Sequence, residues 1–445
     1  MKYDITSNTP PPMPRLGKGT ECLKLILSQA SKDMQAPLLP MLFPILGVHV
    51  SGTEFQYPDR TWREPCGMMA HLVARSGAGK GQLSSIAEAL CRNLRSHDEG
   101  ELARLVEWQR TVRTRGANKE KPPRPEVAFW FLPSDVTNPA FIQNSMACES
   151  QGGRTQYINM PEVEMADRLC GGHRQVSQML RNIYDRQRAG ALRATAEGVT
   201  GNPLLRANIT ISSTPLAARK FYKGDFHTGT FGRMVFSCKP RTARTGRIPR
   251  QGTYSEEFHA ELAKYLLRLQ EARGRHVITP LNLLADRLAR DMADISDLAD
   301  DDDLFDMAKR AILSAWKAGC IMWILAGGEW TRAMADIVEW LVCHDLWSKM
   351  QLFADLIATE SSATTPAACH RGPKNMLDSL PDAFSLPQLE ALRINAGKSK
   401  EGTKFQLKSW KTRGFITLSP QTGLYTKTPA YLGGKGTTAA KTPKD

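Results

Sequence analysis

The stretch HLVARSGAGKGQLSSIAEAL, residues 71–90, joins an apolar run to a helical pattern through a glycine-rich turn. The preceding run, residues 68–73, is short and apolar, which is typical of a buried strand. Beyond the turn, apolar residues recur at helical spacing at Leu83, Ile86, Leu90 and Leu94. A strand, a glycine-rich turn and a helix in this order form an anion site, because backbone N–H groups and the helix N-terminus face one point. The stretch therefore predicts a phosphate-binding loop.

Residues 74–81 depart twice from the consensus G-x-x-x-x-G-K-[ST] of such loops. Ala74 replaces the first glycine, and Gly81 replaces the hydroxyl residue that binds Mg²⁺. We expect Lys80 to lie between the β- and γ-phosphates of ATP. The expected nucleotide contacts are Ser76, Gly77, Ala78, Gly79, Lys80, Gly81 and Gln82. Slow hydrolysis, binding without hydrolysis, and an ordinary glycine-rich turn all remain open.

Further apolar runs after the turn alternate with helical patterns. Strands are predicted within VAFWFLP, RTQYINMPEVE, ANITISSTP and TFGRMVFSCKPR. This alternation predicts an α/β fold: a three-layer P-loop domain with a mostly parallel sheet over residues 19–252, after a disordered segment at 1–18.

From residue 253 to 360 the pattern is helical throughout. Residues 361–375 are typical of a linker. Residues 376–428 contain two short helical patterns, a longer basic helix and a strand–turn–strand, the order of a winged helix. The segment 429–445 is rich in Gly, Lys and Thr, and we expect it to be disordered.

The formal net charge of +14 favours an anionic partner, and DNA is the first candidate. Basic residues gather within residues 110–124 and in two further segments. The candidate DNA contacts lie in these two further segments and are Arg244, Arg247, Lys404, Lys408 and Lys411. Lys404, Lys408 and Lys411 share one face of the basic helix, although lysines on a helix also form ordinary solvated faces.

The nine cysteines are irregularly spaced and contain no CxxC pair. That pattern excludes a disulfide framework and a zinc finger, and it favours a reducing, cytoplasmic compartment. The most apolar short run, APLLPMLFPILGVHV, is interrupted by prolines and too short to span a bilayer. We therefore expect a buried helix or strand there, and no membrane role.

The order of these segments resembles a group of bacterial and mobile-element P-loop ATPases related to AAA+ replicative helicases. The resemblance covers about residues 20–350. It is carried by SGAGKGQL, SDVTNPAFIQNSMACESQGGRTQYINMPEVE, ANITISSTPL and HTGTFGRMVF. It implies an AAA+-like domain that binds ATP and Mg²⁺.

Several site roles follow from the resemblance alone. Glu162 occupies the position of the Walker B glutamate, which polarises the attacking water, but Pro161 replaces the aspartate expected before it. Glu162 and Glu164 are then the carboxylates expected to bind Mg²⁺. The alternative for both is a solvated helix start.

The resemblance also assigns roles to the end of ANITISSTPL and to the arginine of HTGTFGRMVF. Thr214, with Ser213, matches the polar position that orients water near the γ-phosphate. Arg233 matches an arginine finger that reaches the nucleotide of a neighbouring subunit, and Arg219 is the second choice. A simple turn before Pro215 and an ordinary surface arginine are the alternatives.

Together these expectations describe an oligomeric, DNA-acting ATPase, such as a ring-shaped and hexameric replicative helicase or a replication initiator of a mobile element. Two alternatives remain. One is a DNA-binding protein whose degenerate nucleotide site does not hydrolyse ATP. The other is a small-molecule kinase, which the basic charge and the C-terminal winged-helix pattern disfavour.

Overall fold

The computed structural model describes residues 5, 7–115, 122–169, 176–190, 198–226, 229–240, 250–299, 302–364, 376–396, 400–412 and 414–433. Its main sheet has five parallel strands in the order β4-β5-β6-β3-β7. These strands are β3 (Met69–Val73), β4 (Phe131–Leu132), β5 (Gln156–Met160), β6 (Ala207–Ser213) and β7 (Val235–Cys238). The predicted α/β class with a parallel sheet is confirmed.

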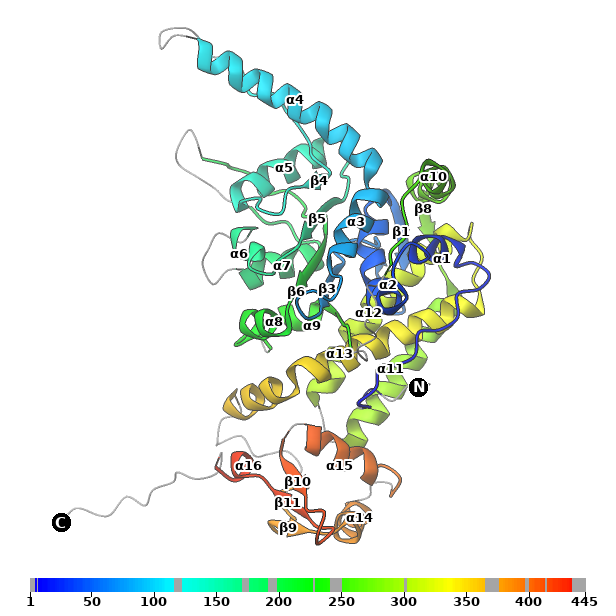
Figure 1. Ribbon diagram of the computed structural model, residues 1–445, viewed down its shortest axis with the longest axis vertical. Coiled ribbons are helices and arrows are strands. Elements are labelled where there is room, and N and C mark those ends of the chain that lie inside the picture. Colours follow the sequence, from blue (N-terminus) through cyan, green and yellow to red (C-terminus); the bar gives the residue numbers. More distant parts are fainter. Residues whose placement is uncertain are drawn as a thin grey trace, which may run out of the picture.

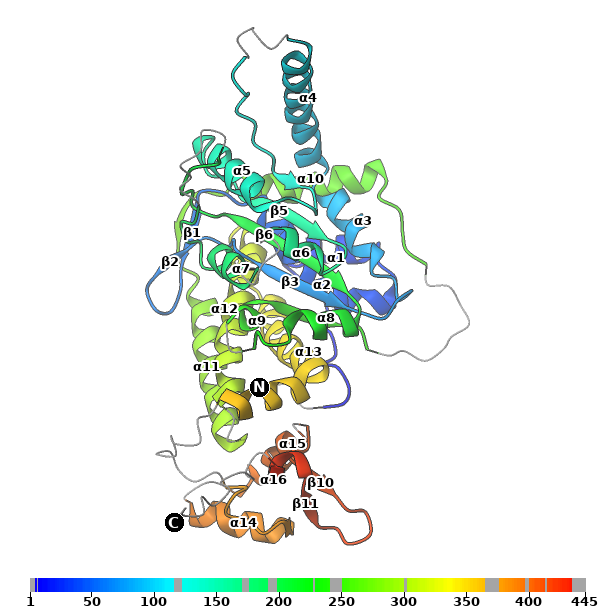
Figure 2. The ribbon, with the colours of Figure 1, turned by 90° about the vertical axis from the view of Figure 1, so that its left-hand side faces the viewer.

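The helices up to residue 233 are α1 (Glu21–Leu27), α2 (Lys32–Gly47), α3 (Gly81–Leu90), α4 (Arg92–Thr114), α5 (Asn138–Ser150), α6 (Met165–Leu169), α7 (Val176–Tyr184), α8 (Pro215–Tyr222) and α9 (Thr230–Arg233). Helices lie on both faces of the sheet (Figures 1 and 2). Helix α2 contacts β3, β6 and β7, whereas α7 contacts β6 from the other side of the sheet (Figure 1).

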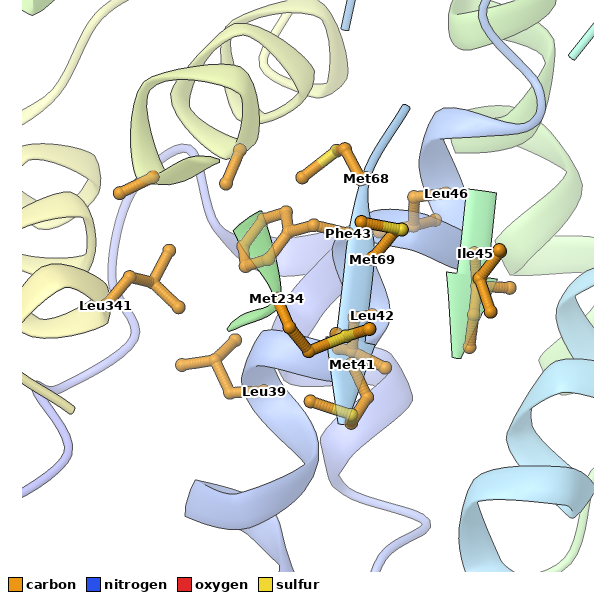
Figure 3. Packing of buried hydrophobic residues seen from close by; sticks show 14 of the residues in the cluster. Leu39, Met41, Leu42, Phe43, Ile45, Leu46, Met68, Met69, Met234 and Leu341 are labelled. Carbon is orange, nitrogen blue, oxygen red and sulfur yellow. The ribbon is translucent and has the colours of Figure 1, made fainter. Parts of the chain in front are cut away.

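Helix α2 contains the apolar run that we expected to be a buried helix or strand. It is helical despite Pro37, Pro40 and Pro44, and its residues from Pro37 to Gly47 are buried. Its leucines, isoleucine and phenylalanine belong to one buried cluster with Met69 of β3, the preceding Met68, and Leu341 of α13 (Figure 3). Side chains of the sheet also hold it, because Asn208 donates to the Pro44 carbonyl at 2.8 Å. Tertiary packing outweighs the low helix propensity of proline here.

The described part of residues 253–360 is mainly helical, but it is not helical throughout as expected, because it includes the short strand β8 (Gly274–His276). Its helices are α10 (Glu256–Glu271), α11 (Thr279–Ala299), α12 (Asp302–Leu325) and α13 (Arg332–Thr364). Strand β8 pairs with β1 (Thr53–Gln56), which also pairs with β2 (Trp62–Arg63). A continuous buried cluster runs from Ile5 to Ile357, so the expected boundary at 252/253 does not divide the core.

Helix side chains satisfy the backbone at both edges of the main sheet. At one edge, the Asp98 carboxylate in α4 accepts from the N–H groups of Trp130 and Phe131 at 2.9 and 2.7 Å. At the other, Asp345 and Ser348 in α13 take the N–H groups of Phe236 and Cys238 at 2.7 and 3.1 Å. Buried N–H groups without acceptors are costly, so these contacts fix both helices against the sheet.

Side chains of α4 and α5 also account for a difference from the sequence prediction. The ladder of the strand predicted at 127–133 is only Phe131–Leu132, because these side chains take the preceding N–H groups.

The expectation of disorder over residues 1–18 is wrong for its described part. Ile5 is buried, and the indole N–H groups of Trp340 and Trp347 donate to the carbonyls of Pro11 and Ser7 at 3.0 and 2.9 Å. A proline-rich segment has few N–H donors but keeps its carbonyl acceptors, and α13 supplies the donors.

The C-terminal part forms its own small buried cluster. Its elements are β9 (Ala383–Phe384), α14 (Leu386–Asn395), α15 (Thr403–Thr412), β10 (Ile416–Leu418), β11 (Tyr425–Lys427) and α16 (Pro429–Gly433). The antiparallel strand order is β10-β11-β9. Residues 376–379 form turns where we expected a helix. Helix α16 begins the segment expected to be disordered.

The described cysteines form no disulfide. In the same described ranges, no helix has both the length and the apolarity needed to cross a membrane. His344, which follows Cys343, lies near the Ser237 hydroxyl at 2.9 Å, so its ring is engaged inside the core.

We expect Asp98→Ala to destabilise the protein by roughly 2–4 kcal/mol, because two buried N–H groups lose their acceptors. Urea unfolding of the two proteins measures the difference. The neighbouring exposed substitution Glu99→Ala should change stability by less than about 0.5 kcal/mol. Equal losses from both substitutions would contradict the capping role of Asp98.

Candidate functional site

The glycine-rich loop lies at the carboxyl edge of the sheet, between buried β3 and the start of α3. Gly77 and Gly79 have φ of 71° and 92°, the left-handed region that glycine enters without strain. A Cβ at Gly77 would meet nothing within 4 Å, so the space beside this residue is open. The backbone therefore has the curled form that lets loop N–H groups face an anion.

Two lysines lie on the loop. The Lys80 ammonium donates to the carbonyls of Ala74 and Arg75 at 3.2 and 3.3 Å. The Lys239 ammonium, from the end of β7, donates to the Ala78 carbonyl at 2.8 Å and pairs with Asp33. Sequence reasoning missed Lys239, because its role depends on β7 lying beside β3.

Asp33 ties the same lysine to α2. Burial raises the pKa of this carboxyl, but hydrogen bonds from Lys239 and Ser31 and the charge of Lys239 outweigh burial, so its pKa is lowered. The Asp33 carboxylate thus remains ionised and holds Lys239 against the loop.

Gln82 does not face the open side of the loop. Its side chain accepts from the Ser31 backbone N–H and donates to the Ser31 hydroxyl, both at 2.9 Å. Gln82 was expected to contact the nucleotide. Its amide instead anchors the first turn of α3 to the start of α2.

The end of β5 lies beside α3. The Asn159 amide donates to the Ser84 hydroxyl at 3.0 Å and accepts from the Thr210 hydroxyl at 3.0 Å. The polar bridge thus joins α3, β5 and β6 one turn beyond Gly81. The sequence predicted that Asn159 lies in this strand, but nothing in the sequence indicated the hydrogen-bond partners of the Asn159 side chain.

Glu162 and Glu164 follow β5 and are both exposed, with buried Val163 between them. Pro161 stands in the aspartate position, and its carbonyl accepts from the Ser212 hydroxyl at 2.8 Å. Glu162 and Glu164 therefore lie at the carboxyl edge of the sheet, as the loop does. No cluster of three or more His, Cys, Asp or Glu side chains suited to a metal occurs among the described residues.

The polar end of β6 is committed to internal contacts. The Thr214 hydroxyl accepts from the Ala217 N–H at 3.3 Å and caps α8. Ser213 is buried, and its hydroxyl lies 2.8 Å from the His71 ring nitrogen Nε2. The turn alternative for Thr214 accounts for the observed contact.

Arg233 lies at the opposite, amino edge of the sheet. Its guanidinium donates to Asp185 at 2.6 Å and to the Gly229 carbonyl at 2.8 Å, and its side chain is 13% exposed. The second choice, Arg219, forms a two-bond pair with Asp355. Within one chain, neither arginine contacts the loop.

Of the predicted DNA contacts, Arg244 and Arg247 lie outside the described residues. Lys404 and Lys411 are exposed on α15, and Lys408 is half-buried. Trp410 is buried in the small C-terminal cluster. Helix α15 also contacts α11.

No family model matches this chain, and the search of curated proteins finds no relative.

Three buried histidines make the stability of the folded protein depend on pH. Burial lowers the pKa of His71 and of His344 to about 3, and that of His49 to about 4. The unfolded chain binds these protons near pH 6.5, whereas the folded chain does not. Stability should therefore fall as the pH drops from about 6.5 to about 4.

The urea midpoint measured across this pH range should fall less steeply for His71→Gln than for the unsubstituted protein. The glutamine does not titrate, so it removes one linked proton. Parallel curves for the two proteins would show that His71 is not held neutral.

Proposed function

We propose that this protein is an oligomeric, DNA-acting ATPase with an AAA+-like P-loop domain. The observation that carries the proposal is the Gly77–Lys80 loop, which turns through two left-handed glycines between a buried strand and a helix N-terminus. The strand order supports it, because β6 lies between β3 and β5. The strand that resembles the family's water-orienting strand, β6, therefore ends beside the loop. The strand that resembles its Walker B region, β5, ends next to β6.

The chain's residues fit the phosphates of a nucleotide. The loop N–H groups and the positive end of α3 would bind them. Lys80 would exchange its two loop carbonyls for phosphate oxygens, since these contacts are exposed or only partly buried. Glu162 would polarise the attacking water.

The residues do not supply the usual donors for Mg²⁺. Gly81 has no side-chain oxygen, Pro161 has no carboxylate, and Asn159 presents an amide to α3. This favours the second candidate, a DNA-binding protein with a nucleotide site that does not turn over.

The position of Arg233 supports an assembly of several copies. This arginine lies at the amino edge of the sheet, whereas the loop lies at the carboxyl edge. Only another copy could bring an Arg233 to this loop, and its pair with Asp185 would have to open.

The C-terminal part supports DNA binding. We infer a winged helix, because two helices precede an antiparallel hairpin and a short strand before them pairs with that hairpin. Helix α15 would present Lys404 and Lys411 to the phosphate backbone. Its contact with α11 means that α15 approaches DNA beside the helical region.

Lys80→Ala should abolish ATP hydrolysis and weaken ATP binding, because the loop loses the lysine expected to lie between the β- and γ-phosphates. The measurement is ATP turnover of the purified protein with and without single-stranded and duplex DNA. DNA-stimulated turnover that disappears in the variant supports the motor. ATP and DNA binding without turnover would support the second candidate, and absence of ATP binding would contradict both.

Gly81→Ser should restore a hydroxyl where the consensus has one. A Cβ at Gly81 meets nothing within 4 Å, so the serine fits. We expect Mg²⁺ to strengthen ATP binding roughly tenfold more in this variant than in Gly81→Ala.

Gly81→Ala is the matched control, since both substitutions stabilise the start of α3 by up to about 1 kcal/mol. ATP affinity measured in Mg²⁺ and in EDTA separates them. An equal Mg²⁺ effect in both variants would mean that a hydroxyl at this position does not reach the metal.

A further inference from the structure

A cavity with a partly polar lining lies at the amino edge of the sheet, away from the loop. Its volume is about 450 Å³. It is bounded by the β1–β2 hairpin, the end of α7 and the middle of α12. The charged and aromatic residues that line it are Trp62, Arg63, Glu64, Tyr184, Asp185, Arg186 and Lys317.

Lys317 is a buried cation that reaches this cavity from α12. Its side chain is 4% exposed, and its ammonium donates to the Cys66 carbonyl at 2.7 Å. The ammonium also lies 4.6 Å from the centroid of the Tyr184 ring. Among the described residues, no carboxylate pairs with it. A buried ammonium without a counter-ion is costly, so the fold retains a charge that an anion would neutralise.

Cations outnumber carboxylates around the cavity. Glu64 is shared by Arg186 and Arg206, at 2.8 and 3.2 Å, and Arg63 pairs with Asp59. Asp185 is shared by Arg233 and Arg310, at 2.6 and 3.9 Å. Of these groups, two carboxylates, Glu64 and Asp185, line the cavity itself, together with three cations, Arg63, Arg186 and Lys317.

Arg186 has a donor to spare. Its Nε atom is buried and has no hydrogen-bond partner in the described structure. Its backbone φ of 53° lies in the left-handed region, which is uncommon for arginine. Lys317 and Arg186 thus bring two cationic side chains to one cavity, one from α12 and one from the turn after α7.

We propose that this cavity binds the phosphate group of a small phosphorylated molecule. Lys317 and Arg186 hold the phosphate oxygens through charge-assisted hydrogen bonds. Trp62, at the cavity wall, covers the organic part of the ligand. The volume suits a molecule of mononucleotide size.

This site is independent of the glycine-rich loop. Lys317 contacts the carbonyl of Cys66, three residues before β3 begins, whereas the loop follows the other end of β3. A nucleotide at the loop and a phosphate at Lys317 therefore occupy opposite ends of one strand.

The state of Lys317 supports the assignment. The pKa of its ammonium is lowered to about 8, chiefly by burial; the nearby guanidinium groups of Arg63 and Arg186 contribute to the lowering, and Cys66 and Asp185 oppose it. A bound phosphate favours the charged form, so binding above about pH 8 should take up a proton.

The test measures binding of AMP and of inorganic phosphate by titration calorimetry to the full chain carrying Lys80→Ala, which disables the loop. We expect AMP to bind this protein and inorganic phosphate to compete with it. Adding Lys317→Met should weaken AMP binding at least about tenfold. Adding Lys264→Met, an exposed lysine on α10, should leave it unchanged.

Loss of AMP binding on Lys80→Ala alone, or equal binding with and without Lys317→Met, would overturn the proposal. Binding of DNA at Lys317 without binding of AMP or phosphate would overturn it too. If Lys317→Met does not fold, Arg186→Gln provides the second variant, with the same expected loss. Because Lys80 is absent throughout, failure here leaves the ATPase proposal standing.

Discussion

The backbone N–H groups at the two edges of the parallel sheet are the constraint on which the rest of the structure depends. Each edge is met by helix carboxylates rather than by a further strand. Meeting this constraint sets the position of α4 at one edge and of α13 at the other. Helix α13 in turn holds the residues before α1 through two indole N–H groups, so one requirement of the sheet organises elements more than 300 residues apart in sequence.

A buried ion pair of Asp345 and Lys349 supports the contact of α13 with the edge strand β7. The two side chains are 2.8 Å apart and almost wholly buried, and Asp345 also accepts from the Phe236 N–H. Burial raises the pKa of Asp345, and the attraction of Lys349 opposes that shift. A lone carboxylate there would be costly, so the lysine and the strand N–H together keep the edge in place.

Local pattern predicted the parts of the site that are contiguous in sequence. The run before Gly77, the turn and the helix after it were visible, because strand, loop and helix each have a short-range signal. Partners far apart in sequence were not visible. Lys239 reaches the loop because β7 lies beside β3, Gln82 bonds Ser31 through the packing of α2, and the Thr214 hydroxyl caps α8.

The helices that cover the two edge strands, β4 and β7, also affect how copies of this chain could associate. A sheet normally grows by pairing an exposed edge strand with a strand of another chain. In the described structure the N–H groups of β4 and β7 that point outward are taken by Asp98, Asp345 and Ser348. Contacts between copies at this sheet must therefore be made by helices and loops, which can slide and reorient in ways that a shared hydrogen-bond ladder forbids.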